Sequence, residues 1–221
     1  MVFPRGERNE PPRRKTVGMR RPALVDLVRG GLLAFVGLVA LEHPLRPDLP
    51  AREHFISEYA SGATHPVAIV AFCAWGVALA AAAALSWERE LRVVTVLLVV
   101  AAVGACVAAA FATQTVAGVL PPGVVRTRSG RLHDQGTLLI FAGLLLAALW
   151  GLRGVPTRRY RLGVLACARA LFLFPAVLVA AELDWPGIGQ RTFVLVGVAW
   201  LWLLVSELAR SDPRRPARAR A

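Results

Sequence analysis

All four histidines of this 221-residue chain fall in or beside two short polar segments, the first and third connections between its apolar stretches. The histidines are His43, His54, His65 and His133, and with them come Glu42, Glu53, Ser57, Glu58, Asp134, Glu182 and Asp184. Imidazole and carboxylate groups are ligands of zinc, and three of them with an open water position would form a hydrolytic metal site. The polar segments are therefore the first place to look for chemistry.

No short motif forces these side chains together. The chain contains no HExxH and no paired CxxC, so the metal hypothesis depends on the fold. The candidate metal ligands are His65, His133 and Asp134, with zinc as the possible ion and no other cofactor expected. The candidate catalytic residues are His133, Asp134 and Ser57. In the alternative interpretation, His65 and His133 simply mark the starts of helices at a membrane interface.

The elements that must position these residues are six long apolar stretches. They cover residues 23–41, 66–85, 93–112, 136–152, 163–181 and 192–208. Each approaches the ~20 residues that an α-helix needs to cross a hydrocarbon core about 30 Å thick. The stretches lack the polar face of a soluble amphipathic helix and the alternation of a barrel strand. The pattern predicts an all-α integral membrane protein, a six-transmembrane-helix bundle in the cell membrane.

Arginines indicate the orientation of this bundle. The formal net charge of +12 is concentrated in the two chain ends and in the fourth connection. The positive-inside rule then predicts that both termini are cytoplasmic and that the histidine-bearing segments face outward. Three arginines run against this bias in the third connection, namely Arg126, Arg128 and Arg131. The predicted organisation is a disordered basic cytoplasmic tail (1–21), a membrane domain (22–209) and a second basic tail (210–221).

The strong positive charge also raises the possibility of nucleic-acid binding. An electrostatic footprint for phosphates requires basic residues on one face or along a recognition helix. Here the basic residues lie in short segments beside apolar spans, where anionic lipid headgroups are the nearer partner. We expect membrane lipids, and no nucleic acid, as partners.

Small residues at four-residue spacing predict how two of the spans pack. They are Gly76, Ala80 and Ala84 on the second span, and Gly104, Ala108 and Ala112 on the third. Such stripes let helix backbones approach closely, although alanine-rich spans also produce them by chance. The spacing favours contact between spans two and three.

Charged residues inside the spans predict a second polar group on the cytoplasmic side. They are Asp26, Arg29, Arg169 and Glu207. Charges at that depth are costly unless they are paired or reach the interface. They could form a network that ties spans one, five and six, or the arginines could reach the headgroups instead.

Three short motifs carry a resemblance to a known family. They are Ile56-Ser57-Glu58-Tyr59-Ala60 before the second span, Gly130-Arg131-Leu132-His133-Asp134 before the fourth, and Gly187-Ile188-Gly189-Gln190-Arg191 at the sixth. In these motifs and their order, residues 24–208 resemble the uncharacterised prokaryotic multi-pass membrane family catalogued as domain of unknown function 998. The resemblance implies the same membrane architecture and points to six residues: Ser57, Glu58, Arg131, His133, Asp134 and Arg191.

The chain departs from the family pattern at Thr113-Gln114-Thr115, where the family commonly carries an acidic residue after a phenylalanine. A carboxylate contribution from this position is therefore not expected here.

The motif residues lie at the predicted outer ends of three spans, which is the arrangement of an interfacial pocket. Arg131, Arg191 and Glu58 are the candidate ligand-binding residues, since guanidinium groups hold phosphates or carboxylates by paired hydrogen bonds. His133 and Asp134 are a candidate acid/base pair. A clasp of internal salt bridges would use the same residues without a ligand.

Three function classes remain open. The first is a protein with an outward-facing lipid or small-ligand binding site, and the second is a metal-dependent membrane hydrolase acting on lipid at the outer face. The third is a small transporter, which should have spans broken near the middle of the membrane, and Pro175 is the only candidate kink.

Overall fold

The computed structural model describes residues 21–210, which form six long α-helices and two short 3-10 helices. Their bounds are α1 (Arg21–Leu45), η1 (Ile56–Ala60), η2 (Gly62–Thr64), α2 (His65–Trp87), α3 (Arg92–Ala110), α4 (Arg128–Gly154), α5 (Arg158–Ala180) and α6 (Pro186–Arg210). All six α-helices are long and apolar enough to cross a membrane, which confirms the predicted multi-pass helical architecture. Apart from Arg21 and Arg210, the tails predicted at 1–21 and 210–221 lie outside the described residues.

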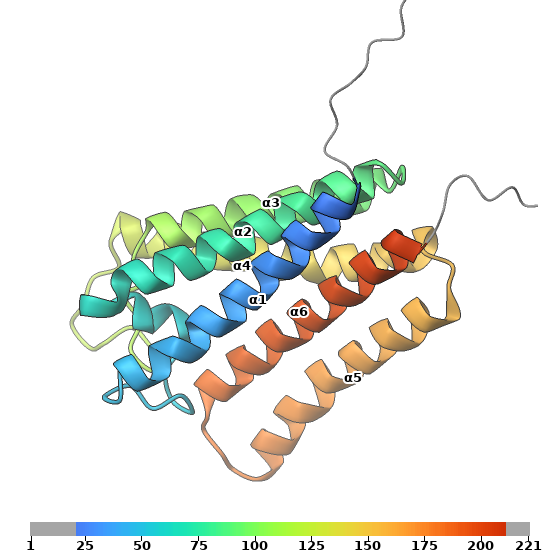
Figure 1. The fold of residues 1–221 in the computed structure, drawn as a ribbon. Helices are drawn as coiled ribbons and strands as arrows, with labels where there is room; N and C mark the ends of the chain where they lie inside the picture. Colours follow the sequence, from blue (N-terminus) through green and yellow to red (C-terminus); the bar gives the residue numbers. More distant parts are fainter. Residues whose placement is uncertain (1–20, 211–221) are drawn as a thin grey trace, which may run out of the picture.

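The helices pack in the order of the chain for the first four, α1 on α2, α2 on α3 and α3 on α4. The last two helices do not continue this order. Helix α6 packs beside α1, and α5 lies at the edge of the bundle next to α6 (Figure 1). Large apolar side chains of α5 are largely exposed, among them Phe172 and Val179 at 77% each. In a membrane these side chains face lipid, so α5 is held mainly by α6.

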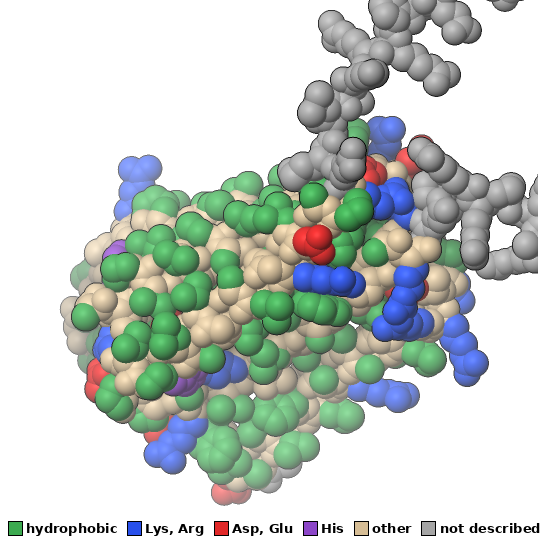
Figure 2. Space-filling view, in the orientation of Figure 1, with side chains coloured by type: hydrophobic (Ala, Val, Ile, Leu, Met, Phe, Trp, Pro, Cys, Tyr) green, Lys and Arg blue, Asp and Glu red, His purple; other side chains and the backbone are tan. Residues whose placement is uncertain are grey.

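The bundle has two chemically different ends. We call one the loop end, since it carries segments 46–64, 111–127 and 181–185, and the other the termini end, where α1 begins and α6 finishes (Figure 1). On the face drawn in Figure 2, arginine side chains gather at the termini end. Residues there include Arg21, Arg89, Arg92, Arg153, Arg158, Arg159, Arg161 and Arg210.

Two glycines explain how the central helices approach one another. A Cβ added to Gly76 would lie 3.6 Å from both Ala105 Cβ and Cys106 Sγ, so α2 packs on α3 there, as the stripes predict. Gly104 faces the other way: a Cβ on it would lie 2.6 Å from the carbonyl oxygen of Gly136 on α4. The stripe of α3 therefore also allows the close approach of α3 and α4.

The structure places the charged residues of the spans beside partners that differ from those of the predicted network. Glu207 is 5% exposed and lies 3.6 Å from Arg159 and 3.3 Å from Arg210. Asp26 and Arg169 are exposed. Arg29 lies over the indole ring of Trp202, 5.3 Å from its centroid. This aromatic face attracts the cation, although Nε of Arg29 is buried without a hydrogen-bond partner within residues 21–210, and Glu207 is paired by arginines at the nearby helix ends.

Candidate functional site

A groove of about 680 Å³ opens at the loop end, where the starts of α4 and α6 meet η1 and the 111–127 segment. Three of the predicted site residues, Ser57, His133 and Asp134, line this one groove although they come from two distant segments. The remaining lining is half polar and half apolar, and includes Thr137, Gln190, Phe55, Phe141 and Phe193. A surface of this mixed character suits a ligand with a polar and an apolar part.

Ser57 reaches the groove because η1 is fastened to α6. The backbone N–H of Ile56 donates to Oε1 of Gln190 at 2.7 Å, across 134 positions of the sequence. This bond fixes the first residue of η1 at the start of α6. Ser57, the next residue, is then 6% exposed and lies against the groove.

His133 has a defined proton arrangement. It lies in α4, is 2% exposed, and its Nδ1 lies 2.7 Å from the carbonyl oxygen of Phe111 and 3.1 Å from that of Ala108. Carbonyl oxygens only accept hydrogen bonds, so Nδ1 must carry the proton, and the neutral ring has its lone pair on Nε2. Nε2 is buried and has no hydrogen-bond partner within residues 21–210. It is available to accept a proton or a hydrogen bond from a ligand.

Asp134 and Arg131 both lie near the start of α4, but their surroundings differ. Asp134 lines the groove and forms an ion pair with Arg126 at 3.0 Å, with side chains 37% and 47% exposed. Exposed pairs of this kind contribute little stability. Arg131 is exposed, does not line the groove, and its Nη1 lies 3.5 Å from the carbonyl oxygen of Arg126.

Glu58 is 4% exposed and joins η1 to the turn at 116–119. Its Oε2 accepts hydrogen bonds from His54 Nδ1 at 2.7 Å and from the N–H of Ala117 at 2.9 Å. Its Oε1 accepts from the N–H of Gly118 at 2.8 Å and from Thr115 Oγ1 at 3.2 Å. Protein groups therefore saturate this carboxylate, which clasps two loop-end segments together, 46–64 and 111–127.

The turn under Glu58 has the geometry that presents backbone N–H groups to an anion. Ala117 and Gly118 both have positive φ, 51° and 76°, between the paired residues Val116 and Val119. Two such residues in succession form a type I′ turn. Glycine suits this conformation, whereas alanine at φ 51° is strained and needs the neighbouring contacts to hold it.

Arg191, one turn into α6, fastens the 46–64 segment, to which Glu58 also belongs. Its Nη1 donates to the carbonyl oxygens of His54 at 2.6 Å, Ala51 at 2.8 Å and Gly187 at 3.0 Å, and its Nε lies 3.3 Å from Nε2 of His43. The guanidinium also lies over the ring of Tyr59, 5.4 Å from the centroid. The motif glycine permits this approach, because a Cβ on Gly187 would lie 2.4 Å from the same two loop carbonyls.

Further contacts fix the segment between α1 and η1. Arg46 pairs with Asp48 at 2.8 Å and donates to the carbonyl oxygen of Ser61 at 2.7 Å. The hydrogen bond from Arg46 lowers the pKa of the Asp48 carboxyl. The hydroxyl of Tyr59 donates to the carbonyl oxygen of Leu49, and burial raises the pKa of Tyr59. The clasp pairs expected from the sequence, Arg191 with Glu182 or Asp184 and Arg131 with Glu58, are replaced by these contacts and by backbone carbonyls.

The candidate metal ligands do not converge in the described part of the chain. His65 is the first residue of α2, its Nδ1 lies 2.7 Å from the carbonyl oxygen of Ala60, and it does not line the groove. Within residues 21–210, no group of three or more His, Cys, Asp or Glu side chains could hold a metal ion.

Gln190, Thr137 and Gln114 contribute to the groove or to the helix start beside it, although the sequence did not single them out as site residues. Gln190 fastens η1, and its position directly before Arg191 in the third motif was the available signal. Thr137 lines the groove one turn after His133. Gln114 lies in the Thr113-Gln114-Thr115 segment, and its Oε1 accepts from the N–H of Thr127 at 2.7 Å and from its hydroxyl at 3.0 Å. Thr127 is the N-cap of α4, so Gln114 holds the start of the helix that presents His133.

Comparison with known proteins agrees with this architecture. Residues 28–207 match the model of a family described as protein of unknown function (DUF998). No curated protein and no solved structure matches the chain. The matched region contains all six helices in whole or in large part, both clasps and the entire groove. The chain belongs to the DUF998 family, a family of proteins of unknown function.

Proposed function

We propose that this protein binds a lipid or another small amphiphilic ligand in the groove at the loop end of a single membrane domain. The domain spans residues 22–209, the loop end faces outward, and the basic tails lie in the cytoplasm. The observation that carries the proposal is the lining of the groove: His133, whose buried Nε2 has no partner within residues 21–210, and Ser57 line the same groove as three phenylalanines.

The orientation is supported by the distribution of arginines. Arginines gather at the termini end with few carboxylates, whereas those of the loop end are matched by acidic residues. The positive-inside rule assigns the first end to the cytoplasm. Fusion of a reporter that is active only outside the cell to the C-terminus should give no signal, whereas the same reporter inserted after Gly123 should be active. The opposite pattern would reverse the orientation and place the groove in the cytoplasm.

Among the candidate ligand-binding residues, Glu58 and Arg191 support the site from beneath. Both oxygens of Glu58 and the Nη1 of Arg191 bond to the loop-end segments, so we assign these two residues the shaping of the groove, although Nη2 of Arg191 is buried without a hydrogen-bond partner within residues 21–210. Arg131 remains at the exposed rim. Contact with ligand falls to Ser57, His133 and Thr137, and Asp134 at the mouth adds a carboxylate.

Native mass spectrometry of the full chain, released from nanodiscs made with total lipid extract of the expression host, tests the proposal. The wild type should retain a bound lipid or small molecule. His133→Gln, which keeps a donor for the α3 carbonyls but removes the ring acceptor, should lower the occupancy by at least about threefold. His65→Gln is the matched control and should leave occupancy unchanged. Absence of any bound species from the wild type, or equal loss in both variants, would overturn the proposal.

A metal-dependent hydrolase acting on lipid at the outer face is the second candidate. It is favoured by one observation: Ser57, His133 and Asp134 line the same groove. Elemental mass spectrometry on the purified wild type and on His133→Ala separates the two functions. Because the described residues group no three metal ligands, near-stoichiometric zinc that is lost in the variant would show a metal site that includes His133 and would favour the hydrolase, whereas equal trace zinc in both would overturn the metal-dependent hydrolase.

A further inference from the structure

We infer that an anionic phospholipid binds at the termini end, with its phosphate at Arg153 and the first part of an acyl chain in a groove between α3 and α4. This site is separate from the loop-end groove and does not depend on the function proposed there. The inference follows from three features: an apolar groove at this end, an arginine without an anionic partner beside it, and the charge of the surrounding helix ends.

The groove between α3 and α4 has a volume of about 760 Å³ and lies where α3 begins and α4 ends. Between Leu146 and Arg153, helix α4 advances about 10 Å at 1.5 Å per residue. This is the depth of the first methylenes of a lipid chain, with Arg153 at the level of the headgroup. The rest of the lining is apolar and comes from both helices: Val93, Leu97, Leu149, Trp150 and Leu152.

Close contacts of the two helices fix the shape of this groove at both of its ends. A Cβ on Gly143 would lie 2.8 Å from the carbonyl oxygen of Leu97, so the backbones touch at the deep end. At the mouth, a Cβ on Gly154 would overlap the side chain of Leu91. The groove is therefore a formed feature of the lipid-facing surface, and a bound chain needs no movement of α3 or α4.

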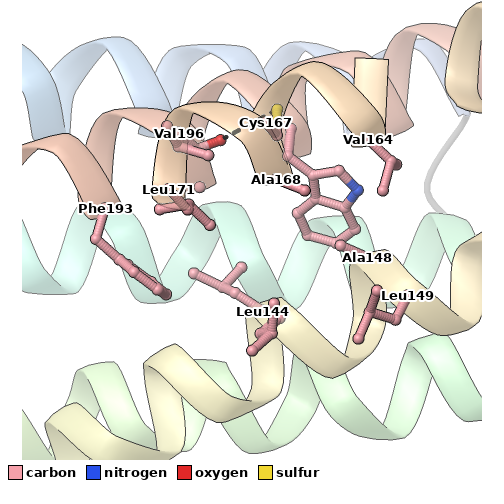
Figure 3. A pocket seen from close by; sticks show the side chains of 12 residues that line it. Leu144, Ala148, Leu149, Val164, Cys167, Ala168, Leu171, Phe193 and Val196 are labelled. Carbon is pink, nitrogen blue, oxygen red and sulfur yellow. Dashed lines mark hydrogen bonds between the residues drawn. The ribbon is translucent and has the colours of Figure 1, made fainter. Parts of the chain in front are cut away.

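The apolar slot between α4, α5 and α6 is not an alternative place for the chain (Figure 3). Side chains such as Leu144, Val164 and Leu171 line it, but its volume is only about 50 Å³. That is the room of a few water molecules. An acyl chain therefore fits the open α3–α4 groove and not this slot.

Arg153, in the last turn of α4, supplies the cation at the mouth of the groove. Its guanidinium carbon lies 4.5 Å from the centroid of the Trp150 ring. This contact positions the cation, and none of its N–H groups has an acceptor within residues 21–210. A guanidinium with open N–H donors matches the paired oxygens of a phosphate, and tryptophan belongs at headgroup level.

The charge around the groove favours an anionic head over a neutral one. The arginines at the termini end outnumber the glutamates there, and the first turn of α3 contains no acidic residue. Glu207 is paired with arginines, Glu88 is paired with Arg21, and Glu90 does not line the groove. Basic sites between transmembrane helices are where anionic headgroups bind.

A larger groove between α2 and α3 provides the comparison. Its volume is about 1050 Å³, and it reaches the termini end at Trp87 and Glu88. A carboxylate therefore lies at its mouth, and Arg21 is already paired with that carboxylate at 3.4 Å. Lipid chains pack against both grooves, but only the α3–α4 groove presents an unpaired cation in its lining.

Native mass spectrometry of the full chain, released from nanodiscs of defined lipids, tests the inference. The wild type should retain phosphatidylglycerol about tenfold better than phosphatidylcholine with the same chains. Arg153→Gln should remove this preference. Arg92→Gln should not, because Arg92 also lies over a tryptophan, Trp87, at the same end but does not line the groove. Equal retention of the two lipids by the wild type, or equal loss of preference in both variants, would overturn the inference.

Photolabelling locates the lipid. Phosphatidylglycerol with a diazirine in the first half of one acyl chain should form adducts mainly in residues 91–97 and 146–153. Leu146→Trp obstructs the groove and should reduce these adducts about fivefold or more, whereas Val99→Trp, in the α2–α3 groove, should not. Val93→Trp serves the same purpose if Leu146→Trp does not fold. Adducts spread evenly over the lipid-facing helices would contradict a site at this groove.

The inference and the proposed function are tested separately, because the two grooves lie at opposite ends of the bundle. Loss of phosphatidylglycerol in Arg153→Gln, with wild-type adducts at the termini end, supports the inference whatever the loop-end groove binds. Loss in His133→Gln but not in Arg153→Gln would place the phospholipid in the loop-end groove. That outcome would overturn the inference and support the proposed function.

Discussion

Substitution of Glu58 by glutamine tests the clasp between η1 and the 116–119 turn. Each carboxylate oxygen accepts one backbone N–H of the turn and one side-chain donor. In Glu58→Gln one oxygen becomes an NH₂ group, which cannot accept. Whichever way the amide is oriented, one backbone N–H, that of Ala117 or of Gly118, then faces a donor.

The energetic effect follows from this count. A buried donor left without a partner costs about 1–3 kcal/mol, and hydrogen bonds to a charged acceptor are worth about 1.5–3 kcal/mol against about 1 kcal/mol for neutral ones. Loss of one bond and weakening of the others should therefore cost about 3–5 kcal/mol. For a chain of this size each kcal/mol lowers Tm by about 2–4 °C, so Tm should fall by about 6–20 °C.

Scanning fluorimetry in detergent measures the fall in Tm, and hydrogen–deuterium exchange locates it. Protection of the Ala117 and Gly118 amides should drop roughly a hundredfold or more, since 1.4 kcal/mol corresponds to a factor of ten. Glu53→Gln is the matched control in the same segment, because Glu53 pairs only with the adjacent Arg52, at 2.9 Å, and is 43% exposed. If Glu58→Gln behaved like this control, the carboxylate would not be the clasp that the contacts indicate.

Two further predictions concern glycines that permit close approach. Gly187→Ala places a Cβ 2.4 Å from two loop carbonyl oxygens and should lower the free energy of unfolding by about 1–3 kcal/mol, whereas Gly189→Ala, with nothing within 4 Å, should be neutral or stabilising. Urea titration followed by tryptophan fluorescence distinguishes them, and equal effects would contradict the clasp at α6. Gly104→Ala places a Cβ 2.6 Å from a carbonyl oxygen of α4 and should destabilise by a similar amount, with Gly37→Ala as the unhindered control. A Tm for Gly104→Ala at or above that of the control would show that α3 and α4 do not touch there.

The helices were predictable from the sequence because a spanning segment must satisfy its own backbone hydrogen bonds, which leaves long apolar runs as the signal. Their ends were not predictable, since α1 continues past the apolar run to Leu45 and α4 begins as early as Arg128. Polar residues at these ends are stabilised by caps and tertiary contacts that carry no periodic pattern. Thr127, held by Gln114, is one such cap.

The convergence of Ser57 with His133 and Asp134 was predictable from motifs at the ends of neighbouring spans. The roles of Glu58 and Arg191 were not, because their partners are largely backbone N–H and carbonyl groups, which every residue possesses. Charge complementarity in the sequence suggests side-chain pairs such as Arg131 with Glu58. It gives no information about hydrogen bonds to backbone N–H and carbonyl groups.

The peripheral place of α5 and the return of α6 beside α1 have a consequence for biogenesis. Helices α1 to α4 can associate pairwise as they emerge from the ribosome, since each contacts its predecessor in the chain. The 46–61 segment is only partly fastened at that stage: Glu58 can already bond to the 116–119 turn, but Gln190 and Arg191, which anchor the segment from the other side, belong to α6. The loop end thus takes its final shape only when the hairpin of α5 and α6 has inserted, and a nascent chain that stops before α6 would expose an unfinished site to quality-control proteases.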